Sequence, residues 1–428
     1  MSCSKLKKII STVMLMVLMV NILPSIRVFA DSTSGSCGDG VNYSFDESTG
    51  TLTISGKGDM YEYISCEEED LSYGIRFCDG PWTTTETYDL CKSSTYAPWI
   101  SYGIKSVIVK NGVTGIGYGA FANCKDLTSV IIENGVTKID GRAFVNCENL
   151  TSIALPNSLT KIGDRAFDNC KRLTSIHIPD SVTEIDNFAF CYCTRLTSIF
   201  IPYGVTSIGS GAFSHCYSLT SIMIDENNTK YKFIDGVLFS KDGTYLHTYL
   251  VSNKAPSYTV PDGVTSIGDW AFDSCKNLTS LFTNNVTNIG EKAFCRCENL
   301  VTYSFDSSTG TLTISGKGSV DFCPHKKSVK SVVIGEGITS IGSSAFRETS
   351  LTSITIPASV TNIGDYVFMG CNKLNTVIYL GVTEPINDDL VFAHAPKSIE
   401  IILSSNYEGT SFCGIKVKRI HDSNCQIA

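Results

Sequence analysis

One pattern of apolar and polar positions recurs along most of the chain. A representative unit runs from Leu150 to Cys170 and reads L-T-S-I-A-L-P-N-S-L-T-K-I-G-D-R-A-F-D-N-C. Its Ala-Phe pair recurs at Phe121, Phe144, Phe167, Phe190, Phe213, Phe272, Phe294 and Phe346, with a Val-Phe variant at Phe368. The first five of these Phe residues are spaced by 23 residues. A fixed period of this length is typical of a repeat protein that stacks its units.

Each unit predicts one coil of a β-rich solenoid. Ile153 and Leu155 alternate with small or polar residues, which predicts a strand with one buried face, and Pro156 ends it. A second short strand and a bend follow. The Ala-Phe pair is then expected to form a short helical or 3₁₀ turn that places Phe167 in the core. Because one coil cannot bury its own apolar face, neighbouring coils must stack about 4.8 Å apart.

These units resemble the BspA-type leucine-rich repeats, over roughly residues 38–420. The motifs that carry the resemblance are L-T-S-I-x-I-P and V-T-x-I-G-x-x-A-F-x-x-C. It implies a curved α/β leucine-rich repeat solenoid, of the kind found in secreted and surface proteins of bacteria and of some mucosal protists. Better-known members are associated with adhesion to host matrix proteins and to other cells, so the resemblance implies an adhesive role.

The stacking leads to two structural expectations. Residues 104–300 should form one continuous stack with a single parallel sheet, in which Ile153, Ile176 and Ile199 each contact the next. Phe167 should be buried between the Phe residues of adjacent coils.

Three departures from the repeat divide the chain. Residues 225–257 carry two apolar runs around Lys241-Asp242-Gly243, which predicts a hairpin that decorates one coil. Residues 41–60 reappear as residues 301–320 with sixteen of twenty positions identical, and each copy predicts a hairpin that starts an array and covers its open edge. The predicted organisation is 1–30 signal peptide, 38–103 N-terminal hairpin module with a Cys-containing insert, 104–300 repeat array, 301–328 second hairpin module, 329–395 short array and 396–428 C-terminal cap.

The N-terminus predicts export. Lys5, Lys7 and Lys8 precede an apolar run of about fifteen residues, and Val28-Phe29-Ala30 places small residues at a cleavage site. That run is shorter than the roughly 20 residues that span a bilayer, although a retained anchor is the alternative. Cleavage after residue 30 removes four positive charges from a net charge of −8 and leaves −12. The protein is therefore expected to be secreted or at the cell surface, without a membrane span after cleavage, and not to bind nucleic acid.

Eight of the eighteen cysteines occupy one position of the repeat. A metal ladder and stacked disulfides are possible functions of this position, but Thr349 takes it in one unit, which favours a small buried packing residue. The cysteines at this position are Cys124, Cys147, Cys170, Cys193, Cys216, Cys275, Cys297 and Cys371. Cys37, Cys66, Cys78 and Cys91 lie outside the ladder, where either disulfides or free thiols fit the sequence.

Candidate chemistry is sparse. Cys191-Tyr-Cys193 and Cys295-Arg-Cys297 lack the second ligand pair of a zinc site, and the six His residues join no catalytic motif. The acidic run 67–70 lacks the alternating oxygen ligands of a calcium loop. We therefore predict no catalytic residues, no metal and no cofactor.

One row of strand residues forms a candidate ligand face. The x position of L-T-S-I-x-I points away from the core and carries large apolar side chains beside a row of Ser. We call this set the strand face: Ile108, Ile131, His177, Phe200, Met223 and Phe282. Cross-strand pairing alone also favours such residues, so the composition has two explanations.

Three classes of function follow from these observations. The first is a secreted or surface protein that binds extracellular proteins or glycans, in an adhesive role. The second is a non-binding structural module of the cell surface. The third is an enzyme with its site in residues 225–257 or 61–100.

Overall fold

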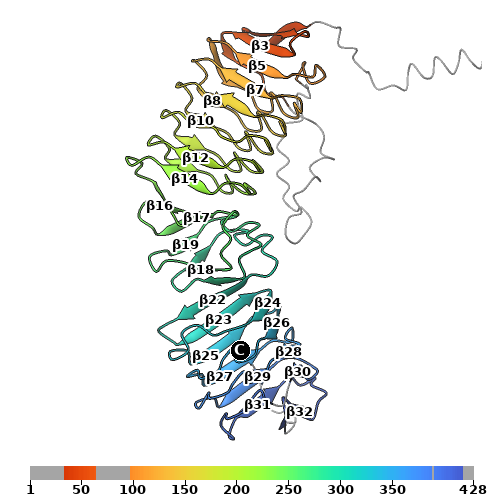
Figure 1. The fold of residues 1–428 in the computed structure, drawn as a ribbon, viewed down its shortest axis with the longest axis vertical. Helices are drawn as coiled ribbons and strands as arrows, with labels where there is room; N and C mark the ends of the chain where they lie inside the picture. Colours follow the sequence, from red (N-terminus) through yellow and green to blue (C-terminus); the bar gives the residue numbers. More distant parts are fainter. Residues whose placement is uncertain (1–32, 64–96, 388–389, 418–428) are drawn as a thin grey trace, which may run out of the picture.

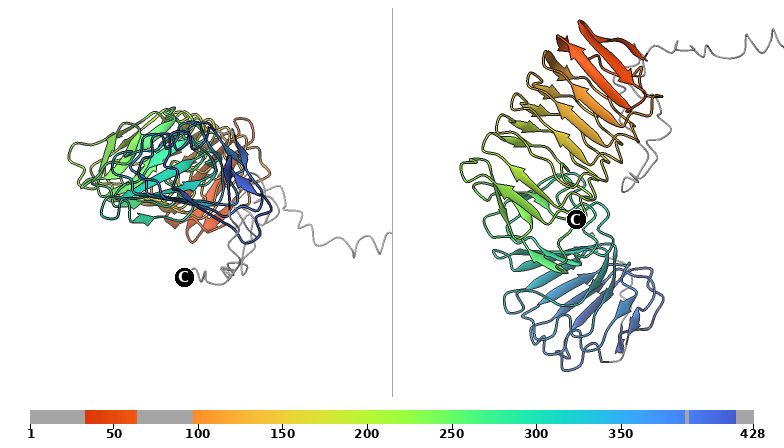
Figure 2. Two further views of the ribbon diagram at one scale, coloured as in Figure 1. Left: turned by 90° about the horizontal axis from the view of Figure 1, so that it is seen from below. Right: turned by 45° about the horizontal axis from the view of Figure 1, so that its top comes forward.

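The computed structural model describes residues 33–63, 97–387 and 390–417 as an elongated stack of coils (Figures 1 and 2). The predicted signal peptide lies outside the described residues, as do Cys66, Cys78, Cys91 and the acidic run 67–70. The chain climbs by one strand spacing per coil, so residues 23 apart in the sequence become neighbours.

Most coils open with a strand of three or four residues. These first strands are β5 (Ser106–Val109), β7 (Ser129–Ile132), β9 (Ser152–Ala154), β12 (Ser198–Ile201), β14 (Ser221–Ile224), β18 (Ser257–Thr259), β20 (Ser280–Phe282), β25 (Ser331–Ile334), β27 (Ser353–Ile356), β29 (Thr376–Tyr379) and β31 (Glu400–Leu403). A shorter strand follows on another side of the coil. These second strands are β6 (Val113–Ile116), β8 (Lys138–Ile139), β10 (Lys161–Ile162), β11 (Glu184–Ile185), β13 (Ser207–Ile208), β19 (Ser266–Ile267), β21 (Asn288–Ile289), β26 (Ile338–Ile341), β28 (Asn362–Ile363) and β30 (Ile386–Asn387).

The row of first strands is not one sheet, so that prediction is wrong. β5, β7 and β9 belong to the N-terminal sheet, whereas β12 and β14 pair only with each other. Residues 175–178 between them are not a strand, and Ile153 and Ile199 therefore lie in separate sheets. The second strands stay paired from β6 to β13 through the same coils. The coils are thus less tightly paired on the first-strand side here, although Ile153, Ile176 and Ile199 share one hydrophobic cluster.

The Ala-Phe turn is not helical, contrary to the expectation from sequence. The described residues contain no helix, and around Phe144 alternate amides bond in two directions. The N–H groups of Arg142, Phe144 and Asn146 donate to carbonyls of the following coil, while the intervening amides close turns within their own coil. Arg142 and Asn146 have φ angles of 56° and 60°, in the left-handed region that stops a right-handed helix.

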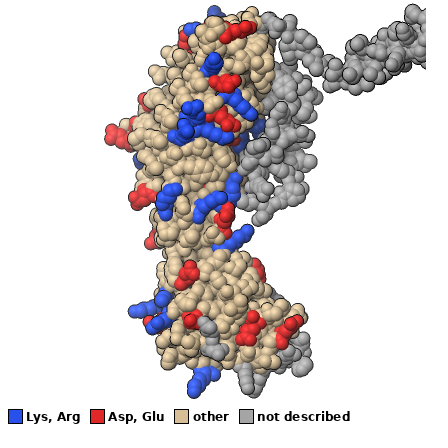
Figure 3. Space-filling view, turned by 45° about the vertical axis from the view of Figure 1, so that its right-hand side comes forward, with Lys and Arg blue, Asp and Glu red and all other residues tan. Residues whose placement is uncertain are grey.

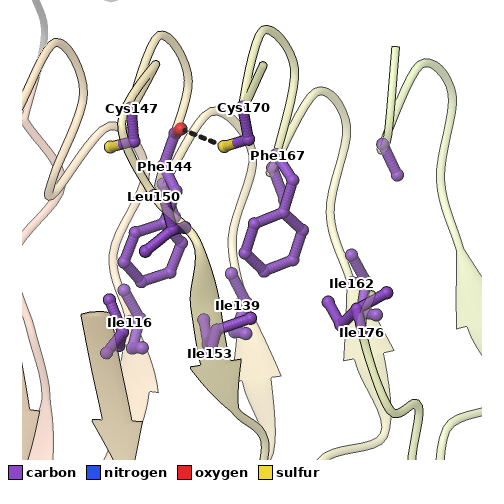
Figure 4. Packing of buried hydrophobic residues seen from close by; sticks show 14 of the residues in the cluster. Ile116, Ile139, Phe144, Cys147, Leu150, Ile153, Ile162, Phe167, Cys170 and Ile176 are labelled. Carbon is purple, nitrogen blue, oxygen red and sulfur yellow. Dashed lines mark hydrogen bonds between the residues drawn. The ribbon is translucent and has the colours of Figure 1, made fainter. Parts of the chain in front are cut away.

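The Phe residues of successive coils form a buried stack, as predicted. Phe167 is fully buried, with its ring centroid 5.4 Å from that of Phe144 and 5.5 Å from that of Phe190. Figure 4 shows these rings beside the Ile residues of the two strand rows. The stack runs from Trp99 to Phe213 and then stops at residues 225–257.

The insert at 225–257 forms the predicted hairpin and a third strand beside it. β16 (Val237–Ser240) and β17 (Tyr245–Tyr249) pair antiparallel around Gly243, and β15 (Tyr231–Ile234) adds a third strand. β17 also pairs parallel with β19, and Tyr249 stacks on Phe272 at 5.0 Å. The insert therefore supplies part of one coil and is not only a decoration.

The two copied sequences form the same hairpin. β2 (Val41–Asp46) pairs with β3 (Thr51–Gly56), and β22 (Val301–Asp306) pairs with β23 (Thr311–Gly316), in the same antiparallel register. Each leads into a short strand of the second row, β4 (Gly58–Asp59) or β24 (Gly318–Val320). β1 (Ser34–Gly38) covers the outer edge of β2. β22 does not cover an open edge, because it continues the sheet of β18 and β20.

The buried face of the sheet changes between β20 and β22. Leu281, which is buried, pairs with the partly exposed Thr302, whereas Phe282 pairs with the buried Tyr303. Paired residues of neighbouring strands lie on the same side of a sheet, so a shift of one residue exchanges the two faces. The core therefore continues on the opposite side of the sheet after β22, as separate hydrophobic clusters on either side of this junction confirm.

The C-terminal end keeps the strand row but loses the repeat. β31 completes the eight-stranded sheet, and β32 (Ser411–Phe412) pairs with β33 (Ile415–Lys416). Phe412 is buried beside Tyr379 at 5.0 Å. The end of the predicted cap, residues 418–428, lies outside the described residues.

Candidate functional site

The strand face is divided between the six-stranded N-terminal sheet and the two-stranded sheet of β12 and β14. Ile108 and Ile131 are direct partners on β5 and β7, and Ile131 is 52% exposed. Phe200 and Met223 are direct partners on β12 and β14, and Met223 is 50% exposed. His177 is exposed on the coil between them, where no strand forms. The structure thus presents two apolar pairs on the first-strand side, separated by two coils that carry Ala154 and His177 at this position.

Phe282 does not belong to this face, and its assignment is wrong. The ring is partly buried and stacks on Tyr303 at 5.0 Å, with Phe322 at 5.7 Å. Phe282 points away from the core of its own coil, as predicted. The change of buried face between β20 and β22 turns that direction into the core of the next segment.

Some of the charged side chains form ion pairs with residues of opposite sign. Lys138 contacts Asp59 at 3.3 Å and Asp140 at 3.2 Å, and Lys161 contacts Glu184 at 2.8 Å. Both signs are interspersed on the face drawn in Figure 3. Exposed pairs of this kind contribute little to stability, and they leave no single-signed patch on that face.

The cysteine ladder packs and donates hydrogen bonds. The Sγ atoms of Cys147, Cys170 and Cys193 lie 3.1, 3.3 and 3.2 Å from the carbonyl oxygens of Phe121, Phe144 and Phe167 in the preceding coil (Figure 4). These thiols are free, and burial raises the pKa of each above its ordinary value. Their burial and their bonds to backbone carbonyls favour the packing interpretation for these residues. The hydrogen-bonding role was not visible in the sequence.

Thr349, which replaces a cysteine in the ladder, and Cys37, which lies outside the ladder, are also buried. The Thr349 hydroxyl lies 3.2 Å from Cys371 Sγ, so threonine replaces cysteine as a small polar packing residue. Cys37 is a free, buried thiol whose pKa is raised to about 12 by burial. The structure thus favours the free-thiol alternative at Cys37, while Cys66, Cys78 and Cys91 lie outside the described residues.

The buried histidine of the insert, His247, is held by contacts to both ring nitrogens. His247 Nε2 donates to the carbonyl oxygen of Ile208 at 2.7 Å, and Nδ1 lies 2.8 Å from Thr248 Oγ1. Since a carbonyl only accepts, the proton of the neutral ring resides on Nε2. Burial lowers the His247 pKa, and both ring nitrogens are engaged. This histidine joins the insert to the preceding coil.

A second buried group joins the coils on either side of the insert. The Arg296 guanidinium donates to both carboxylate oxygens of Asp273, each at 3.1 Å. His215 Nε2 lies 3.1 Å from the same carboxylate without aligned hydrogen-bond geometry, and its Nδ1 is 2.8 Å from the Tyr217 hydroxyl. Tyr192 stacks on the imidazole at 4.0 Å. The scattered positions of these residues in the sequence gave no sign of this group.

A shallow polar hollow lies beside the strand face. It has a volume of about 440 Å³ and is lined by Asn111, Ile132, Glu133, Asn134, Leu155, Pro156 and Asn157. The three Asn residues follow the strands of successive coils at intervals of 23 residues. This spacing was visible in the sequence but was not recognised as a signal.

Neither a metal cluster nor a membrane span is found in the described part of the chain. Residues 33–63, 97–387 and 390–417 contain no group of three or more His, Cys, Asp or Glu placed to hold an ion. Over the same residues, no helix is long and apolar enough to cross a bilayer.

Comparison with known proteins identifies the repeat. A model of the BspA type leucine rich repeat region, in six copies, matches residues 104–242, 247–375 and 316–421. No curated protein matches the chain. A leucine-rich repeat protein from Eubacterium ventriosum ATCC 27560 is 22% identical over 89% of this chain and 91% of its own, with a TM-score of 0.51. At that identity the similarity shows the fold alone.

Two further solved structures are less similar in shape. A leucine rich cell surface protein from Faecalibacterium prausnitzii A2-165 is 28% identical over 81% of this chain and 94% of its own, with a TM-score of 0.43. The pneumococcal vaccine antigen PcpA is 18% identical over 90% and 98%, with a TM-score of 0.44.

Proposed function

The chain belongs to the BspA-type leucine-rich repeat family, and from this membership we propose a secreted or cell-surface protein that binds extracellular proteins or glycans in an adhesive role. The basic and apolar residues before Ala30 support export. The stack of coils supports binding, because a solenoid presents an extended surface built from equivalent positions.

The apolar pair Phe200 and Met223 carries the proposal. The two side chains are neighbours on a two-stranded sheet, and no further strand of the described residues pairs with the outer edge of β14. Exposed apolar groups beside an unpaired strand edge favour association with another molecule. Aromatic and Met side chains also supply adaptable contact area to such a partner.

A non-enzymatic role is part of the proposal. In the insert suggested as an alternative catalytic region, the histidine is buried and held by Ile208 and Thr248. The carboxylate of Asp273 is buried and paired with Arg296, so it is not available to a substrate. Both environments favour structural roles.

The test is a double substitution on the exposed pair. Phe200→Ser with Met223→Ser should weaken binding to a panel of matrix proteins about tenfold or more, because large apolar side chains dominate protein interfaces. Thermal unfolding should change only modestly, since Met223 is half exposed and Phe200 is only partly buried on the same outward side. The matched control is Val333→Ser, at the same template position and 44% exposed, but beyond the change of buried face.

Three outcomes would contradict the proposal. Equal weakening by the Val333 control would mean that the effect is not specific to the pair. Unchanged binding of the double variant would remove the strand face as the site. A purified protein that binds no member of the panel would favour a structural module of the cell surface instead.

A further inference from the structure

Two rows of asparagine run along the same coils. They differ in whether their side chains are hydrogen-bonded to one another. Asn123, Asn146 and Asn169 are partly buried. The amides of Asn146 and Asn169 donate to the side-chain oxygens of Asn123 and Asn146 respectively, each at 2.8 Å. Asn111 and Asn134, in the other row, are exposed, and their side chains make no hydrogen bond within the described residues. The same holds for Asn157. The side chains of the first row are hydrogen-bonded to one another, whereas the second row presents its donors and acceptors to the outside.

The second row continues with an acid and an aromatic ring. Asp180 and Tyr203 occupy the same template position in the next two coils, and Tyr203 is 54% exposed. We call the five residues the turn row: Asn111, Asn134, Asn157, Asp180 and Tyr203. At about 4.8 Å per coil the row is roughly 19 Å long. The hollow of about 440 Å³ lies over its three asparagines.

The rim of this hollow is held in place by charge. Glu133 accepts from Lys110 Nζ at 2.7 Å and from the backbone N–H of Asn111 at 3.0 Å. Both contacts lower the pKa of Glu133, so it stays ionised. Lys110 is occupied by this pair. The five residues of the turn row themselves include one acid, Asp180, and no cation.

We propose that the turn row binds a neutral oligosaccharide laid along the stack. Carboxamides and a carboxylate bind hydroxyl groups through both donors and acceptors, and an exposed tyrosine ring offers a face for a sugar ring. The row carries one acid and no basic residue of its own, which favours a neutral ligand over an anionic one. This site is separate from the strand face and does not depend on that face binding a protein.

An extended peptide fits the row less well. A peptide strand advances by about 3.2–3.4 Å per residue, whereas the coils repeat every 4.7–4.9 Å. The polar groups of the peptide therefore cannot face successive amides of the row at regular positions. Protein partners also need a cluster of apolar or aromatic anchors, and Tyr203 is the single such residue among the five of the row.

The experiment measures binding of cellotetraose, chitotetraose, mannotetraose and maltotetraose to the purified protein by calorimetry. At least one should bind, and Asn134→Ala with Asn157→Ala should weaken it about 10- to 100-fold through the lost hydrogen bonds. Tyr203→Ala should weaken it about fivefold. Circular dichroism should show unchanged folding, because these side chains are exposed.

Two controls separate this site from other effects. Asn285 occupies the same template position, but its amide donates to the Asp262 carbonyl at 3.1 Å, so Asn285→Ala should leave saccharide binding unchanged. Phe200→Ser with Met223→Ser should also leave it unchanged. Failure of all four saccharides to bind would overturn the proposal, as would equal loss in the Asn285 control. Binding of a Ser/Thr-rich decapeptide in their place, lost in the double Asn variant, would assign the row to a peptide.

Discussion

The two hairpins, residues 41–56 and 301–316, have nearly the same sequence and different neighbours. Their strands pair in the same register, from Val41 with Gly56 and from Val301 with Gly316. The first hairpin ends the stack beneath β1, whereas the second joins β20 to β25 inside a continuous sheet. Local sequence therefore determines the hairpin, and the strand that meets its outer edge determines whether it closes a stack or connects two segments.

The buried tyrosine of each hairpin shows the difference most clearly. Tyr43 packs edge-on against Trp99, with 5.3 Å between ring centroids. Tyr303 instead stacks on Phe282, which comes from the preceding coil. The first hairpin is thus anchored to the coil that follows it, and the second is also anchored to the coil before it.

The largest expected effect is that of Trp99→Ala on the first hairpin. Trp99 is fully buried, stacks on Phe121 at 5.7 Å and donates from Nε1 to the Ala120 carbonyl. Its removal should cost about 3–5 kcal/mol of unfolding free energy. Hydrogen exchange should show lost protection in β2 and β3 but not in β22 and β23. Equal loss in both hairpins would show that the two ends of the molecule unfold together.

A matched pair of cavity substitutions tests the connecting role of the second hairpin. Ile54 and Ile314 occupy equivalent, fully buried positions, and replacing either by Ala should cost about 2–5 kcal/mol. Ile314→Ala should also lower hydrogen-exchange protection in β20, because β22 pairs with that strand. Among the described residues no coil precedes the first hairpin, so Ile54→Ala has no counterpart of β20 to affect. Unchanged protection of β20 in the Ile314 variant would contradict this connection.

Sequence reasoning succeeded where a feature depends on the 23-residue period. The burial of Phe167 and the packing role of the cysteines follow from equivalent positions in stacked coils. The predictions were wrong where strand pairing between distant segments determines the structure. The segment Leu173–Pro179 matches the template, yet residues 175–178 form no strand, and Phe282 changes role because of the register between β20 and β22.

The candidate site was predicted in part for the same reason. Alternation within a strand places Ile131 and Met223 on the exposed side, as observed. The turn row has the same period, but whether its amides are paired depends on side-chain geometry. Asn146 and Asn134 cannot be distinguished by spacing alone, since only the coordinates show that one is bonded to its neighbour.

A smaller effect is expected at the junction itself. Phe282 is partly buried, so Phe282→Ala should cost about 1–2 kcal/mol, less than the burial of a complete side chain. The matched control is Thr259→Ala, at the same template position and exposed, which should change the unfolding free energy by less than about 0.5 kcal/mol. A result for Phe282 no larger than that of the control would return this residue to the exposed face.

The smallest expected effect lies in the hairpin turns, where the two copies should behave alike. Asp306 accepts from the Ser308 hydroxyl at 2.6 Å, the Thr309 hydroxyl at 2.7 Å and the Ser308 N–H at 2.8 Å, which lowers its pKa to about 2. Asp46 has the same contacts with Ser48 and Thr49, and its pKa is lowered for the same reason.

The direction of the pH dependence follows from these contacts. Since the unfolded carboxyl has a pKa of about 3.9, the stabilisation is complete above that value and is lost as the pH falls toward 2. Ser308→Ala should raise the Asp306 pKa toward the unfolded value and leave that of Asp46 unchanged, as followed by NMR titration of both carboxyl groups. A shift of Asp46 in the Ser308 variant would show that the two turns are coupled, whereas independent titration would confirm that each turn is determined by its own four residues.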